Sequence, residues 1–189
     1  QIGLPLSPYA VTKYVNELYA GVFANLYDFE LIGLRYFNVF GRKQDPNGAY
    51  AAAIPKFIKA FINYQSPIIH GDGSQSRDFT YIDNVIQANE LAATTKNIKA
   101  LNQVYNVACG EQSFLNDIVE TLKELLSKFD NQIKNVNVSY GPERIGDIKH
   151  SLASIDKAQK LLNYQPSHNV NSGLHSAIQW YWDYFNNNP

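Results

Sequence analysis

Tyr9 and Lys13 are the residues of this sequence whose types and spacing most directly suggest chemistry, and they lie four residues apart in the run 7–13. A tyrosine hydroxyl has an ordinary pKa of about 10, which makes it a weak base near neutral pH. A nearby ammonium group favours the phenolate and lowers that pKa toward neutrality. The pair could therefore transfer a proton. Because the chain contains 13 tyrosines, such a spacing also arises by chance, and the surroundings must decide.

The residues around this pair predict a helix that places both side chains on one face. Ser7 is a suitable N-cap, and Pro8 suits the first turn of a helix. Apolar residues then recur at helical spacing at Val11, Val15, Leu18, Tyr19, Val22, Phe23 and Leu26. Residues four apart on a helix lie one turn apart on the same side, so Tyr9 and Lys13 are expected to be neighbours.

The rest of the chain alternates between predicted strands and helices, which indicates an α/β fold with a parallel sheet. Buried or extended strands are expected at 31–37, 68–70, 77–82, 104–109 and 136–140. Helices are expected near 54–64, from a cap at Asp83 through 91, through 118–126, near 154–162 and near 170–185. Asn38 ends the first of these strands, where turn chemistry is common.

Composition excludes several classes of function. The 16 basic and 17 acidic residues give a net charge of −1 without a basic run, which argues against nucleic acid or an anionic membrane as a partner. No apolar stretch approaches the length of a membrane span. The single cysteine, Cys109, cannot form an internal disulfide, and we interpret it as a buried strand residue of a cytoplasmic protein. No metal site is expected.

The chain also lacks a feature that a dinucleotide-binding protein needs. No Gly-x-Gly-x-x-Gly or related glycine loop follows a predicted strand, so the phosphate-binding half of such a fold is absent. Together with an acid–base pair so close to the first residue, this favours the C-terminal half of an enzyme.

Four runs, 5–13, 34–41, 71–79 and 144–147, together resemble the extended short-chain dehydrogenases of the NAD-dependent epimerase/dehydratase family. They occur in the order and at the spacing of that family. Two further runs, 45–50 and 146–151, make the sequence most similar to bacterial UDP-N-acetylglucosamine 4-epimerases of surface-polysaccharide pathways. The resemblance implies the C-terminal part of a Rossmann-type domain at 1–50 and 82–112. It implies a small UDP-sugar-binding domain at 51–81 and 113–189.

The resemblance also implies a reaction. A tightly held NAD⁺ accepts hydride from C4 of the sugar while the tyrosinate takes the hydroxyl proton, and hydride returns to the other face after the keto sugar rotates. In this scheme Tyr9 is the base, and Lys13 holds the nicotinamide ribose and lowers the tyrosine pKa. The third catalytic group, a serine or threonine, would precede the chain. Residues expected near the cofactor are Tyr9, Lys13, Tyr36, Asn38 and Val39.

Substrate contacts are implied in the same way. Arg77 and Arg144 match arginines that bind the UDP diphosphate, for which planar guanidinium groups are suited. The remaining expected substrate residues are Asn38 near the phosphates, Asp147 on the ribose, Ile69 and His70 on the uracil, and Ala52, His150 and Ser151 in the sugar pocket. Ser151 is small where a bulky tyrosine would restrict the pocket, so UDP-N-acetylhexosamines or their uronic acids are favoured. A small residue rejects smaller sugars only weakly.

Two alternatives stay open at this stage. The chain could derive from another nucleotide-sugar enzyme, such as a dehydratase or decarboxylase, although the residues after Gly146 match epimerases better. It could instead bind UDP-sugars without turnover. We expect the chain alone to be inactive and not to retain NAD. We also expect a homodimer through the first helix, because that helix would expose apolar surface. A separate chain could supply the N-terminal half.

Overall fold

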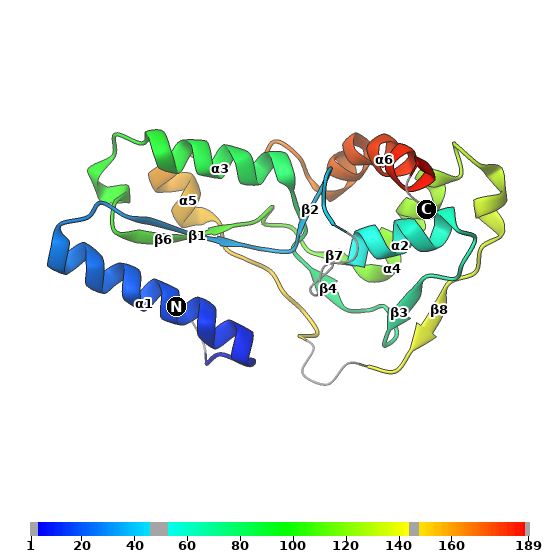
Figure 1. Cartoon of the computed structure of the whole chain (residues 1–189), viewed down its shortest axis with the longest axis horizontal. Helices are drawn as coiled ribbons and strands as arrows, with labels where there is room; N and C mark the ends of the chain where they lie inside the picture. Colours follow the sequence, from blue (N-terminus) through cyan, green and yellow to red (C-terminus); the bar gives the residue numbers. More distant parts are fainter. Residues whose placement is uncertain (1–3, 46–52, 144–147, 188–189) are drawn as a thin grey trace.

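The computed structural model describes residues 4–45, 53–143 and 148–187. Helices and strands alternate through these ranges (Figure 1). In chain order the elements are α1 (Pro8–Tyr27), β1 (Ile32–Tyr36), β2 (Val39–Phe40), α2 (Ala53–Ile62), β3 (Ile68–His70), β4 (Ser76–Arg77), β5 (Thr80–Tyr81), α3 (Ile82–Thr94), η1 (Ile98–Ala100), β6 (Gln103–Val107), β7 (Ser113–Phe114), α4 (Leu115–Leu126), η2 (Asn131–Asn135), β8 (Ser139–Gly141), α5 (Asp156–Leu162) and α6 (Val170–Asn187).

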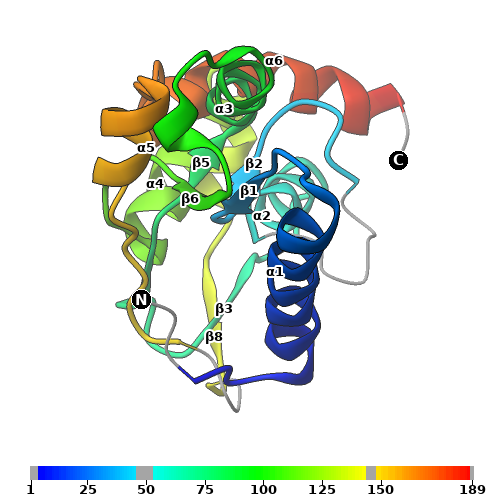
Figure 2. The ribbon, with the colours of Figure 1, turned by 90° about the vertical axis from the view of Figure 1, so that its left-hand side faces the viewer.

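The longest strand pair, β1 with β6, is parallel and runs from Ile32 opposite Gln103 to Tyr36 opposite Val107. Helix α3 lies on one side of this pair and α1 on the other (Figures 1 and 2). Two shorter pairs, β2 with β5 and β3 with β8, are also parallel, whereas β4 and β7 are antiparallel. Parallel strands joined through helices are the α/β architecture that the sequence predicts.

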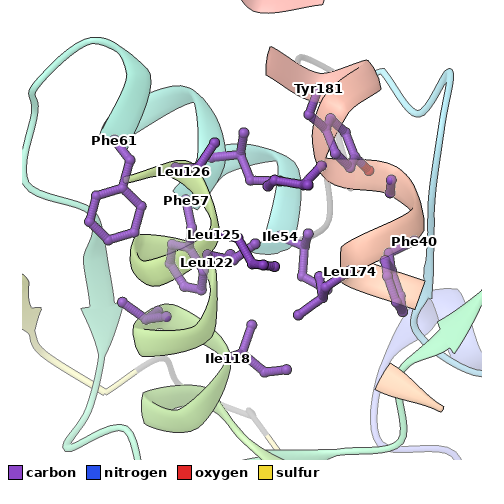
Figure 3. Close-up of a cluster of buried hydrophobic side chains, with 14 of the residues drawn as sticks. Phe40, Ile54, Phe57, Phe61, Ile118, Leu122, Leu125, Leu126, Leu174 and Tyr181 are labelled. Atoms are coloured by element: carbon purple, nitrogen blue, oxygen red, sulfur yellow. The ribbon is translucent and has the colours of Figure 1, made fainter. Parts of the chain in front are cut away.

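Two clusters of buried side chains form the hydrophobic core. The larger cluster joins α2, α4 and α6, and Figure 3 shows its central members. They include Ile54, Phe57, Phe61, Leu122, Leu126, Leu174 and Tyr181. The smaller cluster joins α3, β6 and α5 through Val85, Ala88, Tyr105, Val107, Ala158 and Leu162. Helix α5 belongs by sequence to the predicted second domain at 113–189. In the structure it packs against α3 and β6. The division into two domains stays a prediction.

Helix α1 begins as its sequence predicts but is buried very little. The Ser7 hydroxyl accepts a hydrogen bond from the Ala10 N–H at 3.1 Å, which confirms the N-cap. Ala24 is the single buried residue of the helix in this structure. The apolar residues Val11, Leu18, Val22 and Leu26 are all exposed, Leu26 by 70% of its surface. The helix therefore presents an apolar face that the described part of the chain does not cover.

Three predicted boundaries are wrong. Helix α3 begins at Ile82 after Tyr81, so Asp83 lies in its first turn and is not its cap. Strand β6 ends at Val107, before Cys109. The strand expected from 136 begins only at Ser139, because the Val136 N–H bonds the Ile133 carbonyl at 3.0 Å and closes η2.

Among the described residues, no helix combines the length and apolarity that crossing a membrane would require.

Candidate functional site

Tyr9 and Lys13 lie on the first two turns of α1 and share one face, as the sequence predicts. The Lys13 ammonium nitrogen is 5.2 Å from the centre of the Tyr9 ring. A cation at this distance from an aromatic face is attracted to it. Tyr9 as a whole residue is 51% exposed. The Lys13 ammonium thus lies close to the Tyr9 ring, and the role of the pair in proton transfer stays a prediction.

An ion pair joins this helix to the sheet. Glu17, one turn after Lys13, accepts two hydrogen bonds from Arg35 of β1, Nε to Oε1 and Nη2 to Oε2, each at 2.6 Å. The hydrogen bond to Glu17 raises the pKa of the Arg35 guanidinium. Two-pronged pairs of this kind define direction as well as distance. Since α1 buries so little apolar surface, the Glu17–Arg35 pair is a main determinant of where Tyr9 and Lys13 lie.

The expected cofactor residues at the end of β1 have defined partners. The Tyr36 hydroxyl donates to Asn89 Oδ1 of α3 at 3.0 Å. Asn38 has φ of +34°, and its Nδ2 donates to the Asp78 carbonyl at 3.0 Å. Val39 begins β2 and is half-buried. The turn between β1 and β2 is therefore held by the chain that follows Arg77.

The segment around β4 brings together three of the predicted substrate residues. Arg77 Nη1 donates to the carbonyls of Ser76 at 2.8 Å and Lys149 at 3.3 Å. Ser76 N–H donates to the Lys149 carbonyl, and Ser151 N–H donates to the Ser76 carbonyl, both at 3.0 Å. Arg77, His150 and Ser151 thus lie on two adjacent extended segments, and their roles at a diphosphate and a sugar pocket stay predictions.

Asp78 is fully buried and organises the loops behind this segment. Its carboxylate accepts the N–H groups of Cys109 at 2.9 Å, Gly110 at 3.0 Å and Ala153 at 3.4 Å. Gly110 has φ of +79°, a conformation that favours glycine, and this turn directs its N–H toward the carboxylate. Burial raises the pKa of Asp78, while the three N–H donors act in the opposite direction. The same interaction turns the chain out of β6, which explains why the strand ends before Cys109.

The two predicted uracil contacts differ in their surroundings. Ile69 is 1% exposed and belongs to the larger core cluster, which argues against a direct contact of its side chain with a ligand. His70 is half-buried, and its Nδ1 lies 3.2 Å from the Pro142 carbonyl. Three other predicted substrate residues, Ala52, Arg144 and Asp147, lie outside the described residues.

Cys109 has the character of a structural residue. Its side chain is half-buried, and its Sγ contacts the His168 carbonyl at 3.5 Å. Burial raises the pKa of the thiol to about 11, with Glu111 and Asp78 adding to the effect. A thiol of this pKa holds very little thiolate at neutral pH, which argues against a nucleophilic role.

Ser76, Asp78 and Glu17 are site-forming residues that sequence reasoning did not single out. Each acts by hydrogen bonding to a residue distant in sequence, and spacing does not reveal such partners. The sequence nevertheless contains a pattern that points to Ser76 and Asp78. Ser76 and Asp78 flank Arg77 in an extended segment, where alternate side chains face opposite sides, and two polar residues on the buried side must find partners.

Comparison with known proteins identifies the family. The profile of the NAD dependent epimerase/dehydratase family matches residues 3–108, more than half of the chain. The chain belongs to this family. It spans about half the length of the curated relatives it matches. One of these is a UDP-glucuronate 4-epimerase of Thermodesulfobacterium geofontis, 35% identical over 95% of this chain and 52% of that protein.

Solved structures of family members are similar in fold. A UDP-N-acetylglucosamine 4-epimerase from Methanobrevibacter ruminantium M1, in complex with UDP-N-acetylmuramic acid, is 39% identical with a TM-score of 0.84. The match covers 98% of this chain and 56% of that one. A UDP-glucuronic acid 4-epimerase from Bacillus cereus, in complex with UDP-glucuronic acid and NAD, is 32% identical with a TM-score of 0.82. That match covers 98% and 55%. These neighbours are Rossmann-type epimerases, which confirms the predicted fold class.

The described residues fit one end of NAD. Tyr9, which is 51% exposed, and the Lys13 ammonium over its ring are donor groups of the kind suited to the ribose next to the nicotinamide. The sequence offers no glycine loop for the pyrophosphate. Tyr9 and Lys13 are thus suited to the reactive end of the cofactor, while the sequence has no glycine loop for its phosphates, and binding of NAD by this pair stays a prediction.

Proposed function

We propose that this chain provides the proton-transfer pair and the substrate site of a UDP-N-acetylhexosamine 4-epimerase, acting in the synthesis of surface-polysaccharide precursors. The observation that supports this most strongly is the pairing of the 76–77 and 149–151 segments. It places Arg77 beside the two residues expected in the sugar pocket, His150 and Ser151. The relatives, which act on UDP-sugars, supply the substrate class.

In this proposal Tyr9 removes the proton from the C4 hydroxyl of the sugar and returns a proton to the C4 oxygen when hydride is added to the opposite face of C4. Lys13 stabilises the phenolate and holds the cofactor ribose. Arg77 neutralises the diphosphate, and Asn38 lies near it. NAD supplies the hydride acceptor when bound, and we propose that the complete enzyme uses it while this chain alone does not retain it.

Ser151 supports the preference for an N-acetylated sugar. It is half-buried and fixed through its backbone to Ser76, so its small side chain sets a fixed wall. UDP-glucuronate is the main competitor, because one relative is an epimerase of that sugar. An open pocket accepts both, so the choice depends on affinity.

Calorimetric titration of the chain with UDP-N-acetylglucosamine, UDP-glucuronate, UDP-glucose and NAD⁺ tests the site. We expect UDP-sugar binding, strongest for the N-acetylated sugar, and no NAD⁺ binding. Arg77→Ala should weaken UDP-sugar binding about 10- to 100-fold, because a charge-assisted hydrogen bond to phosphate is lost. Arg42→Ala is the control, because Arg42 pairs with Asp83 at the surface. Equal binding of ADP-glucose, or no effect of Arg77→Ala, would contradict the proposal.

Turnover separates the two alternatives. If the chain binds UDP-sugars but epimerises none when joined to the rest of an enzyme, the non-catalytic alternative is favoured. Formation of a dehydrated or decarboxylated product would favour another nucleotide-sugar enzyme. We expect epimerisation only.

We further propose that α1 forms a homodimer interface. Val11, Val15, Leu18 and Val22 follow one another at spacings of four and three residues and are all exposed. This is the pattern of a helix that packs against another helix. We expect sedimentation equilibrium to show a dimer that Leu18→Lys converts to monomer, because a buried charge opposes the contact. Asn16→Lys, on the opposite face of α1, should leave the dimer intact. A wild-type monomer would exclude this interface.

A further inference from the structure

Ser76 makes three connections to the segment that carries the predicted sugar pocket. Its N–H donates to the Lys149 carbonyl, and its carbonyl accepts the Ser151 N–H, both at 3.0 Å. Its Oγ lies 2.8 Å from Nδ1 of His150. Ser76 is fully buried, at 0% exposure. Water does not reach a fully buried hydroxyl, so its hydrogen-bond partners are the protein groups around it.

A fourth group bears on the direction of the hydrogen bond to His150. Gln112 Nε2 donates to Ser76 Oγ at 2.6 Å. A serine hydroxyl has one hydrogen to donate and otherwise accepts. Gln112 occupies one acceptor position of this hydroxyl, and among the described residues His150 Nδ1 is the other group that contacts it, so we assign the hydroxyl hydrogen to His150 Nδ1. A neutral imidazole whose Nδ1 accepts carries its hydrogen on Nε2.

This hydrogen bond also relates His150 to Arg77. Ser76 faces the interior of the molecule, and the next residue, Arg77, projects from the other side of the extended segment. Arg77 donates to the same two carbonyls, those of Ser76 and Lys149, that define the pairing. The guanidinium and the imidazole are therefore held in a fixed relation by one buried serine.

We propose that Ser76 and Gln112 are positioning residues for substrate recognition. The chain of hydrogen bonds Gln112–Ser76–His150 keeps the imidazole in the tautomer with hydrogen on Nε2 and holds the 149–151 segment against Arg77. The exposed His150 then presents an N–H donor to a sugar substituent that accepts a hydrogen bond, such as the carbonyl of an acetamido group. This inference rests on the proposed function for its ligand, but its tautomer can be measured without one.

The first test is nitrogen-15 NMR of the histidine side chains in the ligand-free chain near neutral pH. We expect His150 to carry its hydrogen on Nε2. His70 is an internal reference for the other tautomer. Its Nδ1 faces the Pro142 carbonyl, which only accepts, so His70 should carry its hydrogen on Nδ1. Ser76→Ala should give His150 a mixture of tautomers and leave His70 unchanged. Hydrogen on Nδ1 in the wild type, or no effect of Ser76→Ala, would overturn the hydrogen-bond chain.

A second variant reverses the hydrogen bonds without removing the serine. Gln112→Glu has the same shape but can only accept, so the Ser76 hydroxyl should donate to Glu and His150 should carry hydrogen on Nδ1. This variant keeps the buried hydroxyl and tests the inference even where Ser76→Ala folds poorly. An unchanged tautomer in Gln112→Glu would contradict the assignment.

The second test is binding of UDP and of UDP-N-acetylglucosamine. Ser76→Ala should weaken the UDP-sugar about tenfold and UDP less than twofold, since one sugar contact is lost. His150→Asn keeps a polar group near Nδ1 but lacks Nε2, and should give the same selective loss. Equal loss for both ligands would indicate general destabilisation and overturn the positioning role. If the wild type binds neither ligand, the proposed function and the sugar contact both fail, whereas the tautomer still decides the hydrogen-bond chain.

Discussion

Replacing Asp78 with alanine should lower the free energy of unfolding by about 3–5 kcal/mol, because three backbone N–H groups would lose their acceptor in a buried site. Asp78→Asn keeps one acceptor and should cost about 2 kcal/mol. Chemical denaturation followed by circular dichroism measures both values. The exposed Asp72→Ala, whose carboxylate bonds its neighbour Ser74, is the control and should change stability little. A loss below about 1 kcal/mol for Asp78→Ala would show that water replaces the carboxylate.

The pH dependence of the Asp78→Asn effect has a defined sign. Burial raises the pKa of Asp78 in the folded chain, so the folded state holds this proton more tightly than the unfolded state. The stability that this provides is fully present below the unfolded pKa of about 3.9 and is lost as pH rises through the folded pKa. Asparagine does not titrate. The stability advantage of wild type over Asp78→Asn should therefore grow as pH falls from neutral toward about 4. A shrinking advantage would mean that the three N–H donors outweigh burial.

The largest effect on activity is expected at Tyr9. We consider an enzyme made by joining this chain to the part of the Thermodesulfobacterium geofontis relative that it does not match. Tyr9→Phe should reduce kcat for epimerisation about 10²- to 10⁴-fold with little change in KM, because the substituted group acts on the reacting proton. Tyr19→Phe is the matched control, since Tyr19 lies on the same helix and is 63% exposed. Activity of Tyr9→Phe above a tenth of wild type would exclude Tyr9 as the base.

Local signals predicted most of the secondary structure. Ser7 caps α1 as expected, and the apolar run at 31–37 forms β1, because capping and burial depend on neighbouring residues. The errors arise where a distant or competing hydrogen bond decides. Cys109 follows apolar residues, but its N–H bonds to Asp78, 31 positions earlier, and the strand ends. Val136 was expected in a strand because of its alternation with Val138, yet its N–H closes a helical turn.

Contacts between residues distant in sequence also limit what can be predicted of the candidate site. The family resemblance named Arg77, His150 and Ser151, and the structure places them together. The residue that joins them, Ser76, contacts a histidine 74 positions later, and no sequence spacing contains that information. Ile69 is a residue that the resemblance names as a substrate contact but whose side chain is buried in the core. Within β3 it alternates with the exposed Ile68, and the side that it faces is the core.

The alternation of side chains at 76–78 has a consequence for which changes of sequence this segment can accept. One inserted or deleted residue there would turn Arg77 inward and both polar partners outward, removing the arginine and the supports of the neighbouring segment at once. The bonds from Ser76 to Lys149 and Ser151 use backbone atoms, so they do not depend on the side chain at 151. A substitution of the side chain at 151 therefore leaves these two bonds in place, whereas a change in the length of 76–78 would remove them.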